Sequence, residues 1–195
     1  ASSRVIVHEK IYDAFVERFV SEMDKLSVGP ALDPTTQIGP VVSDTQLKSN
    51  LSYVEIARNE GCEVVSGQHL AERNTGYFQR PGVFLNANNK MRSSREEIFG
   101  PVASIIKVGD FEEAVATAND TEFGLSSAIC TRSLYYAREF KRLSEAGMAM
   151  VNLPTAGVDY HVPFGGRKNS SYGSREQGRA AIDFYTTTKT TYSFA

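Results

Sequence analysis

The sequence predicts an α/β protein with an open, mostly parallel sheet, and two observations support this fold class. Nearly continuous apolar runs, "VASIIKV" (102–108) and "MAMVN" (148–152), are typical of strands buried on both faces. Amphipathic helical segments separate such strands, and this order favours right-handed crossovers between parallel neighbours. A hydrophobic content of 41% in 195 residues is ordinary for a globular protein with one sizeable core.

The first sixty residues predict a strand and two helices. "RVIV" (4–7) is a β-branched run, and residues 9–26 repeat apolar side chains at helical steps of three and four. After a loop rich in Gly and Pro, Ser43 with Gln46 three positions later has the spacing of a capping box. Gly61 is a natural C-terminal cap for this second helix.

The middle of the chain alternates strands and helices. Asp110, followed three positions later by Glu113, predicts the start of a helix, and Gly147 predicts the end of the next one. Pro81 within "YFQRPGVFL" suggests that this strand lies at an edge or carries a bulge. The strands are expected at 62–67, 77–85, 102–108, 125–130 and 148–152, and the helices at 111–119 and 134–146.

The last third differs in character. Residues 153–174 form a long stretch rich in glycine and aromatic residues, without helical or strand periodicity, and such loops are usually functional. A helix is expected at 175–184. "YTTTKTTYSF" (185–194) alternates Thr and Tyr, which predicts an exposed strand that needs a partner.

Composition excludes several classes of function. Lys and Arg number 21 against 23 Asp and Glu, so no basic surface for nucleic acid is expected. No apolar run approaches the roughly 20 residues of a membrane helix. Cys62 and Cys130 lie far apart without metal-ligand spacing, which predicts two small buried side chains in a reducing cytoplasm. The three histidines are scattered, so no metal site is proposed.

"EEIFGPV" (96–102) is the first candidate for chemistry. From spacing alone, Glu96 and Glu97 are best interpreted as a solvated helix end, and neighbouring helical residues point in different directions. At most one carboxylate therefore turns inward. The following Gly-Pro leads into a buried strand, and ligands of open α/β sheets bind near strand ends. A carboxylate there could accept hydrogen bonds from sugar hydroxyls.

"PFGG" (163–166) is the second candidate. It is either an ordinary turn whose glycines allow positive φ, or a segment that sets Phe164 over a pocket. Neither "GGRK" nor "GSREQG" has the spacing of a phosphate-binding loop or a dinucleotide fingerprint.

Taken together, the motifs resemble the C-terminal part of an aldehyde dehydrogenase. The matching stretches, in the family's order, are "SSRVIVH", "IGPVVSDTQL", "EEIFGPV", "NDTEFGLSSAI", "PFGG" and "REQG…YTTTKT". The resemblance implies a three-layer catalytic-domain portion over 1–183, an oligomerisation strand over 184–195 and a nucleotide-binding domain outside this chain. The loop "VNLPTAGVDYHVPFGGRK" resembles the branch that acts on α-ketoglutarate semialdehyde (2,5-dioxopentanoate).

The resemblance also implies roles for individual residues. Glu97 would accept hydrogen bonds from the nicotinamide ribose of NAD or NADP and Phe99 would pack near the nicotinamide, while Glu96 stays in solvent. Phe164 would line the substrate tunnel, and Glu176 matches a family glutamate near the active site. The other expected substrate-binding residues are Asn152, Thr155 and Val158.

The family oxidises an aldehyde to a carboxylic acid through a cysteine thioester. The resemblance places that cysteine before Ala1, so we expect the natural protein to continue upstream and assign no catalytic residue in this chain. We therefore expect the isolated chain to be inactive, and the whole protein to be a cytoplasmic homo-oligomer, a dimer or tetramer. The alternative is a non-catalytic binding or assembly module that retains the fold.

Overall fold

A computed structural model describes residues 2–70 and 76–195, and the chain divides into two compact units. The first unit comprises residues 2–120 and the second comprises residues 121–195. Within the described residues, no helix combines the length and the apolar character that crossing a membrane requires.

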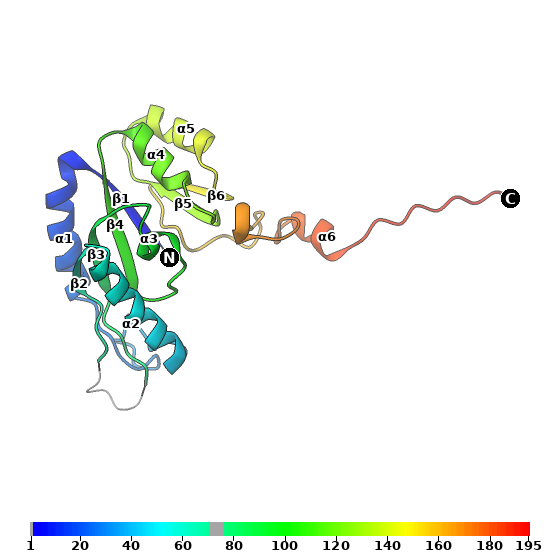
Figure 1. Cartoon of the computed structure of the whole chain (residues 1–195). Helices are drawn as coiled ribbons and strands as arrows, with labels where there is room; N and C mark the ends of the chain where they lie inside the picture. Colours follow the sequence, from blue (N-terminus) through cyan, green and yellow to red (C-terminus); the bar gives the residue numbers. More distant parts are fainter. Residues whose placement is uncertain (1, 71–75) are drawn as a thin grey trace. The chain divides into compact units, whose positions relative to one another are not determined.

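The first unit is built on a four-stranded sheet in the order β1-β4-β3-β2 (Figure 1). β4 pairs in parallel with β1 and with β3, whereas β2 pairs antiparallel with β3. The strands are β1 (Arg4–His8), β2 (Glu63–Ser66), β3 (Gly82–Ala87) and β4 (Val102–Val108). The prediction of a mostly parallel α/β sheet is confirmed.

Helices cover both faces of this sheet, which gives the first unit three layers. Along β4, Ile105 packs against residues of α1, and its neighbour Ile106 packs in the cluster that contains residues of α2. This alternation follows from the two-residue period of a strand. The helical elements are η1 (Glu9–Ile11), α1 (Tyr12–Asp24), α2 (Asp44–Asn59), α3 (Arg92–Arg95) and α4 (Phe111–Asn119).

Three of the four predicted helix caps, at Ser43, Gly61 and Asp110, are present. The Ser43 hydroxyl accepts a hydrogen bond from the Gln46 amide at 3.1 Å, and Asp110 accepts one from the Glu113 amide at 2.8 Å. Gly61 has a φ of +93°, the left-handed conformation that glycine adopts without steric cost.

One strand prediction needs correction. The predicted strand 77–85 begins only at Gly82, and β3 is a central strand rather than an edge strand. Pro81 precedes the strand, so it removes no ladder hydrogen bond from it. The expected irregularity is real, since the register with β4 shifts between Phe84 and Ala87.

The second unit has a parallel strand pair with short helices. β5 (Ser126–Ile129) pairs with β6 (Met148–Val151) in a sheet of its own, so the parallel strands of the chain belong to two sheets. β6 is half-buried to exposed, and the prediction that it is a buried strand was wrong. The remaining elements are α5 (Leu134–Leu143), η2 (Lys168–Ser170) and α6 (Ala180–Tyr185).

Two helix boundaries in the second unit differ from expectation. α5 ends at Leu143 and not at Gly147, because the Ser144 backbone is extended. α6 begins only at Ala180, since Gln177 and Gly178 have φ values of +64° and +51°, which no α-helix contains.

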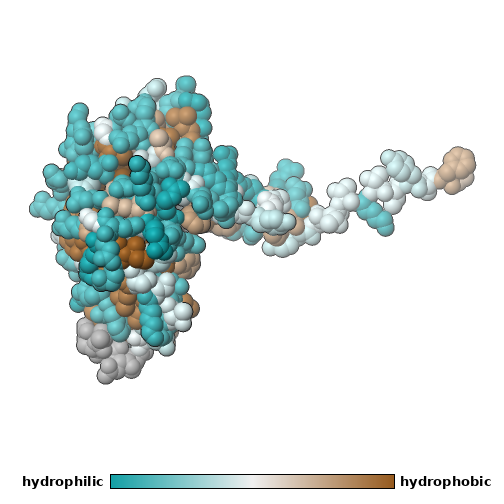
Figure 2. Space-filling model, viewed as in Figure 1, coloured by the Kyte–Doolittle hydropathy of each residue, from teal (hydrophilic) through white to brown (hydrophobic). Residues whose placement is uncertain are grey.

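Residues 186–195 form no helix or strand in the single chain and are exposed throughout. In Figure 2 this tail is mainly pale, which marks intermediate hydropathy. The predicted oligomerisation strand therefore stays a prediction.

Candidate functional site

The "EEIFGPV" motif lies between α3 and β4 and contains a strained aromatic residue. Phe99 has a φ of +59° and is 78% exposed. A bulky residue in the left-handed region is an outlier that costs on the order of 1–3 kcal/mol. Such strain persists where neighbouring contacts impose it, and it gathers at functional sites. Burial of the ring cannot explain this conformation, because the ring faces solvent.

The two glutamates of the motif have different surroundings. Glu97 is exposed, and among the residues that the structure describes it makes no hydrogen bond or ion pair. Glu96 is half-buried and accepts hydrogen bonds from Arg92 Nε at 2.8 Å and from the Tyr53 hydroxyl at 2.6 Å. The expectation that the two carboxylates differ is confirmed, but in the opposite sense: Glu96 is the half-buried residue with protein partners, and Glu97, which was expected to turn inward, is exposed.

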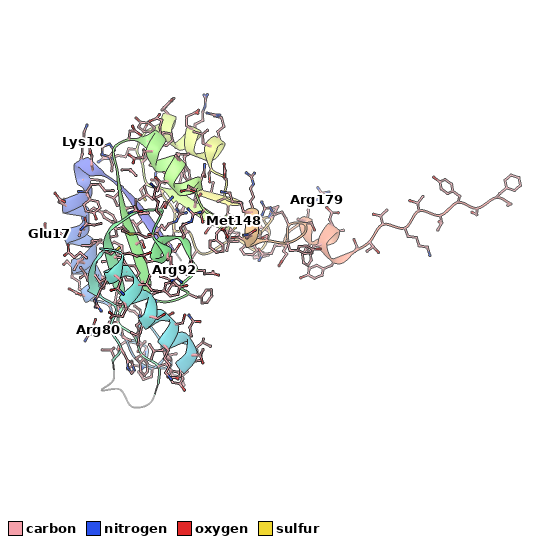
Figure 3. The ribbon with its side chains drawn as sticks, viewed as in Figure 1. Lys10, Glu17, Arg80, Arg92, Met148 and Arg179 are labelled. Atoms are coloured by element: carbon pink, nitrogen blue, oxygen red, sulfur yellow. The ribbon has the colours of Figure 1, made fainter. Side chains whose placement is uncertain are left out.

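These contacts change the acidity of Glu96. The hydrogen bond from Arg92, followed by that from Tyr53, lowers the pKa of Glu96 below its usual range. Glu96 therefore remains an anion at neutral pH and is occupied by protein partners. In Figure 3, Arg92 is labelled at the start of α3. Of the two carboxylates, only that of Glu97 is free to meet a ligand.

A third carboxylate anchors the short helix before the motif. Glu60, just after α2, accepts hydrogen bonds from the backbone N–H groups of Arg92 (2.7 Å) and Ser93 (3.2 Å) and from the Ser93 hydroxyl (2.7 Å). Burial raises the pKa of Glu60, but the Ser93 hydroxyl and the two backbone bonds together hold it below its usual value. The N-terminus of α3 is thus satisfied within the protein.

The "PFGG" segment is held by a short backbone bridge. Phe164 and Glu176 exchange both backbone hydrogen bonds, at 2.7 and 2.8 Å. Phe164 is half-buried, and Glu176 is exposed. Arg175 Nη1 donates to the Gly166 carbonyl at 2.6 Å and would lie only 2.8 Å from a Cβ at position 165, so Gly165 is needed for space as well as for its φ of +154°.

The loop residues predicted to bind substrate differ in whether their polar groups already bind the protein. Both polar atoms of the Asn152 side chain do: Oδ1 accepts a hydrogen bond from the Thr131 N–H at 2.8 Å, and Nδ2 donates one to the Thr131 carbonyl at 2.9 Å. The Thr155 carbonyl accepts a hydrogen bond from the Ser126 hydroxyl at 3.2 Å. Val158 is half-buried.

The surroundings of Cys62 do not suit a nucleophile. Cys62 is buried, burial raises the pKa of its thiol, and its Sγ lies 3.4 Å from Met91 Sδ. A neutral buried thiol is a poor nucleophile. Cys130 follows β5 and is exposed, so the prediction that both cysteines are buried holds only for Cys62.

Comparison with known proteins identifies the class to which this fold and motif belong. A sequence model described as the aldehyde dehydrogenase family matches residues 1–191, and the chain belongs to that family.

Among curated proteins, the chain is 46% identical over 196 residues to an α-ketoglutarate semialdehyde dehydrogenase from Haloferax volcanii and 40% identical over 195 residues to one from Bacillus subtilis. Each alignment covers 98% of this chain but only 40% of the relative. The chain thus spans about two fifths of the length of these relatives.

Solved structures show the same fold. HpcC from Thermus thermophilus superposes with a TM-score of 0.89 at 38% identity, over 96% of this chain and 37% of that one. An aldehyde dehydrogenase from Mycobacterium tuberculosis, solved in complex with NAD+, superposes with a TM-score of 0.89 at 33% identity, over 95% and 38%.

Proposed function

We propose that this chain is the part of an NAD(P)-dependent aldehyde dehydrogenase that holds the nicotinamide ribose and lines the substrate entrance. The observation that carries the proposal is the strained, exposed Phe99 two residues after the uncommitted carboxylate of Glu97. An exposed aromatic ring in a strained backbone conformation adds nothing to the stability of the fold, but it can contribute to a binding site, where such strain is commonly found.

The residues of the motif suit a dinucleotide. The Glu97 carboxylate offers two acceptor oxygens, which match the two adjacent hydroxyls of a ribose. Phe99 offers an apolar ring face against which a flat heterocycle can pack. When bound, the nicotinamide would accept a hydride from the substrate. Both NAD and NADP carry this ribose, so Glu97 does not distinguish them.

The proposed substrate is a semialdehyde such as α-ketoglutarate semialdehyde. This proposal rests on the names of the relatives from Haloferax volcanii and Bacillus subtilis and on the loop over 153–162. Phe164, Thr155 and Val158 are the proposed lining residues. Because its amide is bonded to Thr131, we assign Asn152 the task of shaping the loop rather than contacting substrate through its side chain.

The nucleophile is proposed to be a cysteine outside residues 1–195, which forms a thioester that water then hydrolyses to the acid. Cys62 is a buried thiol whose pKa is raised by burial, and the resemblance to the family aligns neither Cys62 nor Cys130 with the nucleophile, so neither is assigned that role. The proposal therefore includes that the isolated chain has no dehydrogenase activity. Residence in the cytoplasm is part of the same proposal.

A non-catalytic assembly module is the second candidate. The exposed tail favours it, since Tyr192 and Phe194 are 95% and 102% exposed and suit a partner strand. The same tail is expected to join copies of an oligomeric dehydrogenase, so the tail alone does not separate the two functions.

A chimera separates them. Residues 1–195 replace the matching C-terminal part of the Bacillus subtilis relative, and NAD(P)H formation is followed with α-ketoglutarate semialdehyde. We expect activity in the chimera and none in the isolated chain. A chimera that folds and binds NAD+ but shows no oxidation would favour the module, and activity of the isolated chain would contradict the assignment of the nucleophile.

The variant Glu97→Gln in the chimera tests the ribose contact. Loss of a charged acceptor is expected to raise the KM for NAD+ roughly tenfold. Glu17→Gln on the exposed face of α1, labelled in Figure 3, is the charge-matched control and should leave that KM unchanged. Equal KM values for the two variants would remove Glu97 from the site.

A further inference from the structure

One face of α2 and the residue just beyond the helix contact the "EEIFGPV" motif or the helix before it at four points. Gln46, Asn50 and Tyr53 are separated by four and three positions, so they lie along one side of the helix, and Glu60 continues the same row. All four side chains are polar. Asn50 is completely buried, even though it is polar and lies one helical turn after the core residue Leu47. Gln46, Tyr53 and Glu60 are half-buried, and a polar row whose central member is fully buried indicates a specific partner.

The first contacts form a chain of amides. Gln46 Nε2 donates to the Ile98 carbonyl at 2.9 Å and to Asn50 Oδ1 at 2.8 Å. Asn50 Nδ2 donates to Gln79 Oε1 at 3.0 Å, and Gln79 Nε2 donates to the Gly67 carbonyl at 2.9 Å. Asn50 and Gln79 are both 0% exposed. With the Asn50 amide turned end for end, its nitrogen would lie 3.0 Å from the Ile98 carbonyl, so the Asn50 amide lies against this carbonyl in either orientation. A buried network of amides holds the groups that it binds in a defined geometry.

Asn50 also restricts the backbone at Gly100, the residue that follows Phe99. A Cβ on Gly100 would lie 2.6 Å from Asn50 Nδ2 and 2.7 Å from its Cγ. Gly100 is therefore required because the backbone passes directly over the Asn50 amide, and not because of a positive φ.

The remaining contacts hold the segment just before the motif's strained residue. Tyr53 donates its hydroxyl to Glu96, and Glu60 binds the first turn of α3. Phe99 is consequently flanked by a fixed carbonyl at residue 98 and a fixed backbone at residue 100. Rotation of the peptide between Ile98 and Phe99 toward an unstrained conformation would turn the Ile98 carbonyl away from Gln46.

We propose that α2 acts as a template that imposes the left-handed conformation of Phe99, with Asn50 and Tyr53 as positioning residues for Glu97 and Phe99. The link to cofactor binding rests on the proposed function, whereas the template itself does not. Neither Asn50 nor Tyr53 has to touch the cofactor. Their effect is to keep the Glu97 carboxylate and the Phe99 ring in one arrangement before the dinucleotide arrives, which lowers the entropic cost of binding.

The template is tested on the 195-residue chain by NMR relaxation. Backbone order parameters of residues 97–100 are expected near 0.85 in the parent chain and to fall toward about 0.6 in Asn50→Leu, which removes both amide hydrogen bonds but keeps the branched side-chain shape. Tyr53→Phe keeps the ring and should loosen residues 96 and 97. Ser52→Ala, on the exposed side of α2, is the control and should change neither.

Two readouts distinguish failure of the template from failure of the ribose contact. If residues 96–100 keep their order parameters in Tyr53→Phe and in a folded Asn50→Leu, the template is overturned. If Asn50→Leu does not fold, Tyr53→Phe decides alone. In the chimera, both variants are expected to raise the KM for NAD+ about fivefold while the KM for aldehyde changes less than about twofold. Lower order parameters at residues 96–100 together with an unchanged KM for NAD+ would support the template and overturn the ribose contact.

Discussion

At the scale of single residues, a side chain is available for function only if it does not already bind other groups of the protein. Glu96 and Glu97 are adjacent and chemically identical, yet Arg92 and Tyr53 occupy Glu96 and leave Glu97 free. The same distinction applies to Asn152, whose side-chain oxygen and nitrogen both form hydrogen bonds with the backbone of Thr131. A carboxylate that has no partner among the described residues, next to a strained aromatic ring, is the combination that a ligand can complete.

Phe99 should reveal its strain in substitutions. Phe99→Asn places a residue that tolerates positive φ at an exposed position, so the free energy of unfolding should stay equal or rise by up to about 1 kcal/mol. Phe99→Val introduces a β-branched residue and should lower the free energy of unfolding by about 1–2 kcal/mol. Urea unfolding followed by circular dichroism measures both. A stability loss in Phe99→Asn as large as in Phe99→Val would show that the ring, and not the backbone, matters.

At the scale of elements, a half-buried arginine connects β1 to the end of α4. Arg4 donates to the Thr117 carbonyl at 2.8 Å, to the Ala118 carbonyl at 3.1 Å and to Asn89 Oδ1 at 2.9 Å. These carbonyls belong to the last turn of α4, where no backbone donor follows. Burial lowers the pKa of Arg4, and the attraction of Asp120 opposes that shift.

Removal of this arginine should weaken the first unit. Arg4→Met keeps much of the apolar stem but leaves the Ala118 carbonyl and the Asn89 amide oxygen without the Arg4 donor, at a cost of about 1–3 kcal/mol. The Thr117 carbonyl still accepts a hydrogen bond from Asn89 Nδ2 at 2.8 Å. Arg18→Met on the exposed side of α1 is the matched control, expected to change stability by less than about 0.5 kcal/mol. Urea unfolding of the two variants compares them, and equal midpoints would mean that water replaces Arg4 at no cost.

At the scale of the whole molecule, we expect the C-terminal tail to contribute to assembly rather than to the stability of the single chain. Residues 186–195 are exposed and form no regular structure. An exposed, unpaired segment rich in Thr and Tyr has strand propensity but no ladder to join until another chain supplies one.

Deletion of residues 186–195 should therefore have two separate outcomes. The free energy of unfolding of the isolated chain is expected to change by less than about 0.5 kcal/mol, because the tail buries nothing. The molar mass of the chimera, measured by light scattering after gel filtration, should fall from that of an oligomer to that of a smaller species. An unchanged mass would assign oligomer formation to another surface.

Local features of this protein could be predicted from its sequence because they depend on neighbours three or four positions away. The Ser43 and Asp110 caps, the left-handed Gly61 and the buried strand β4 are confirmed on that basis. The "EEIFGPV" motif was also recognisable, since its residues are contiguous.

What the tertiary structure alone decided depends on contacts between distant residues. Tyr53 is 43 positions from Glu96, and Gln46 is 52 positions from Ile98, so no local spacing indicates which carboxylate is held or why Phe99 is strained. The sequence contains one weak indication of this network, because Asn50 is a polar residue among the apolar inner positions of α2. Its partners, however, became evident only when the folded chain brought Gln79 and Gly100 against it.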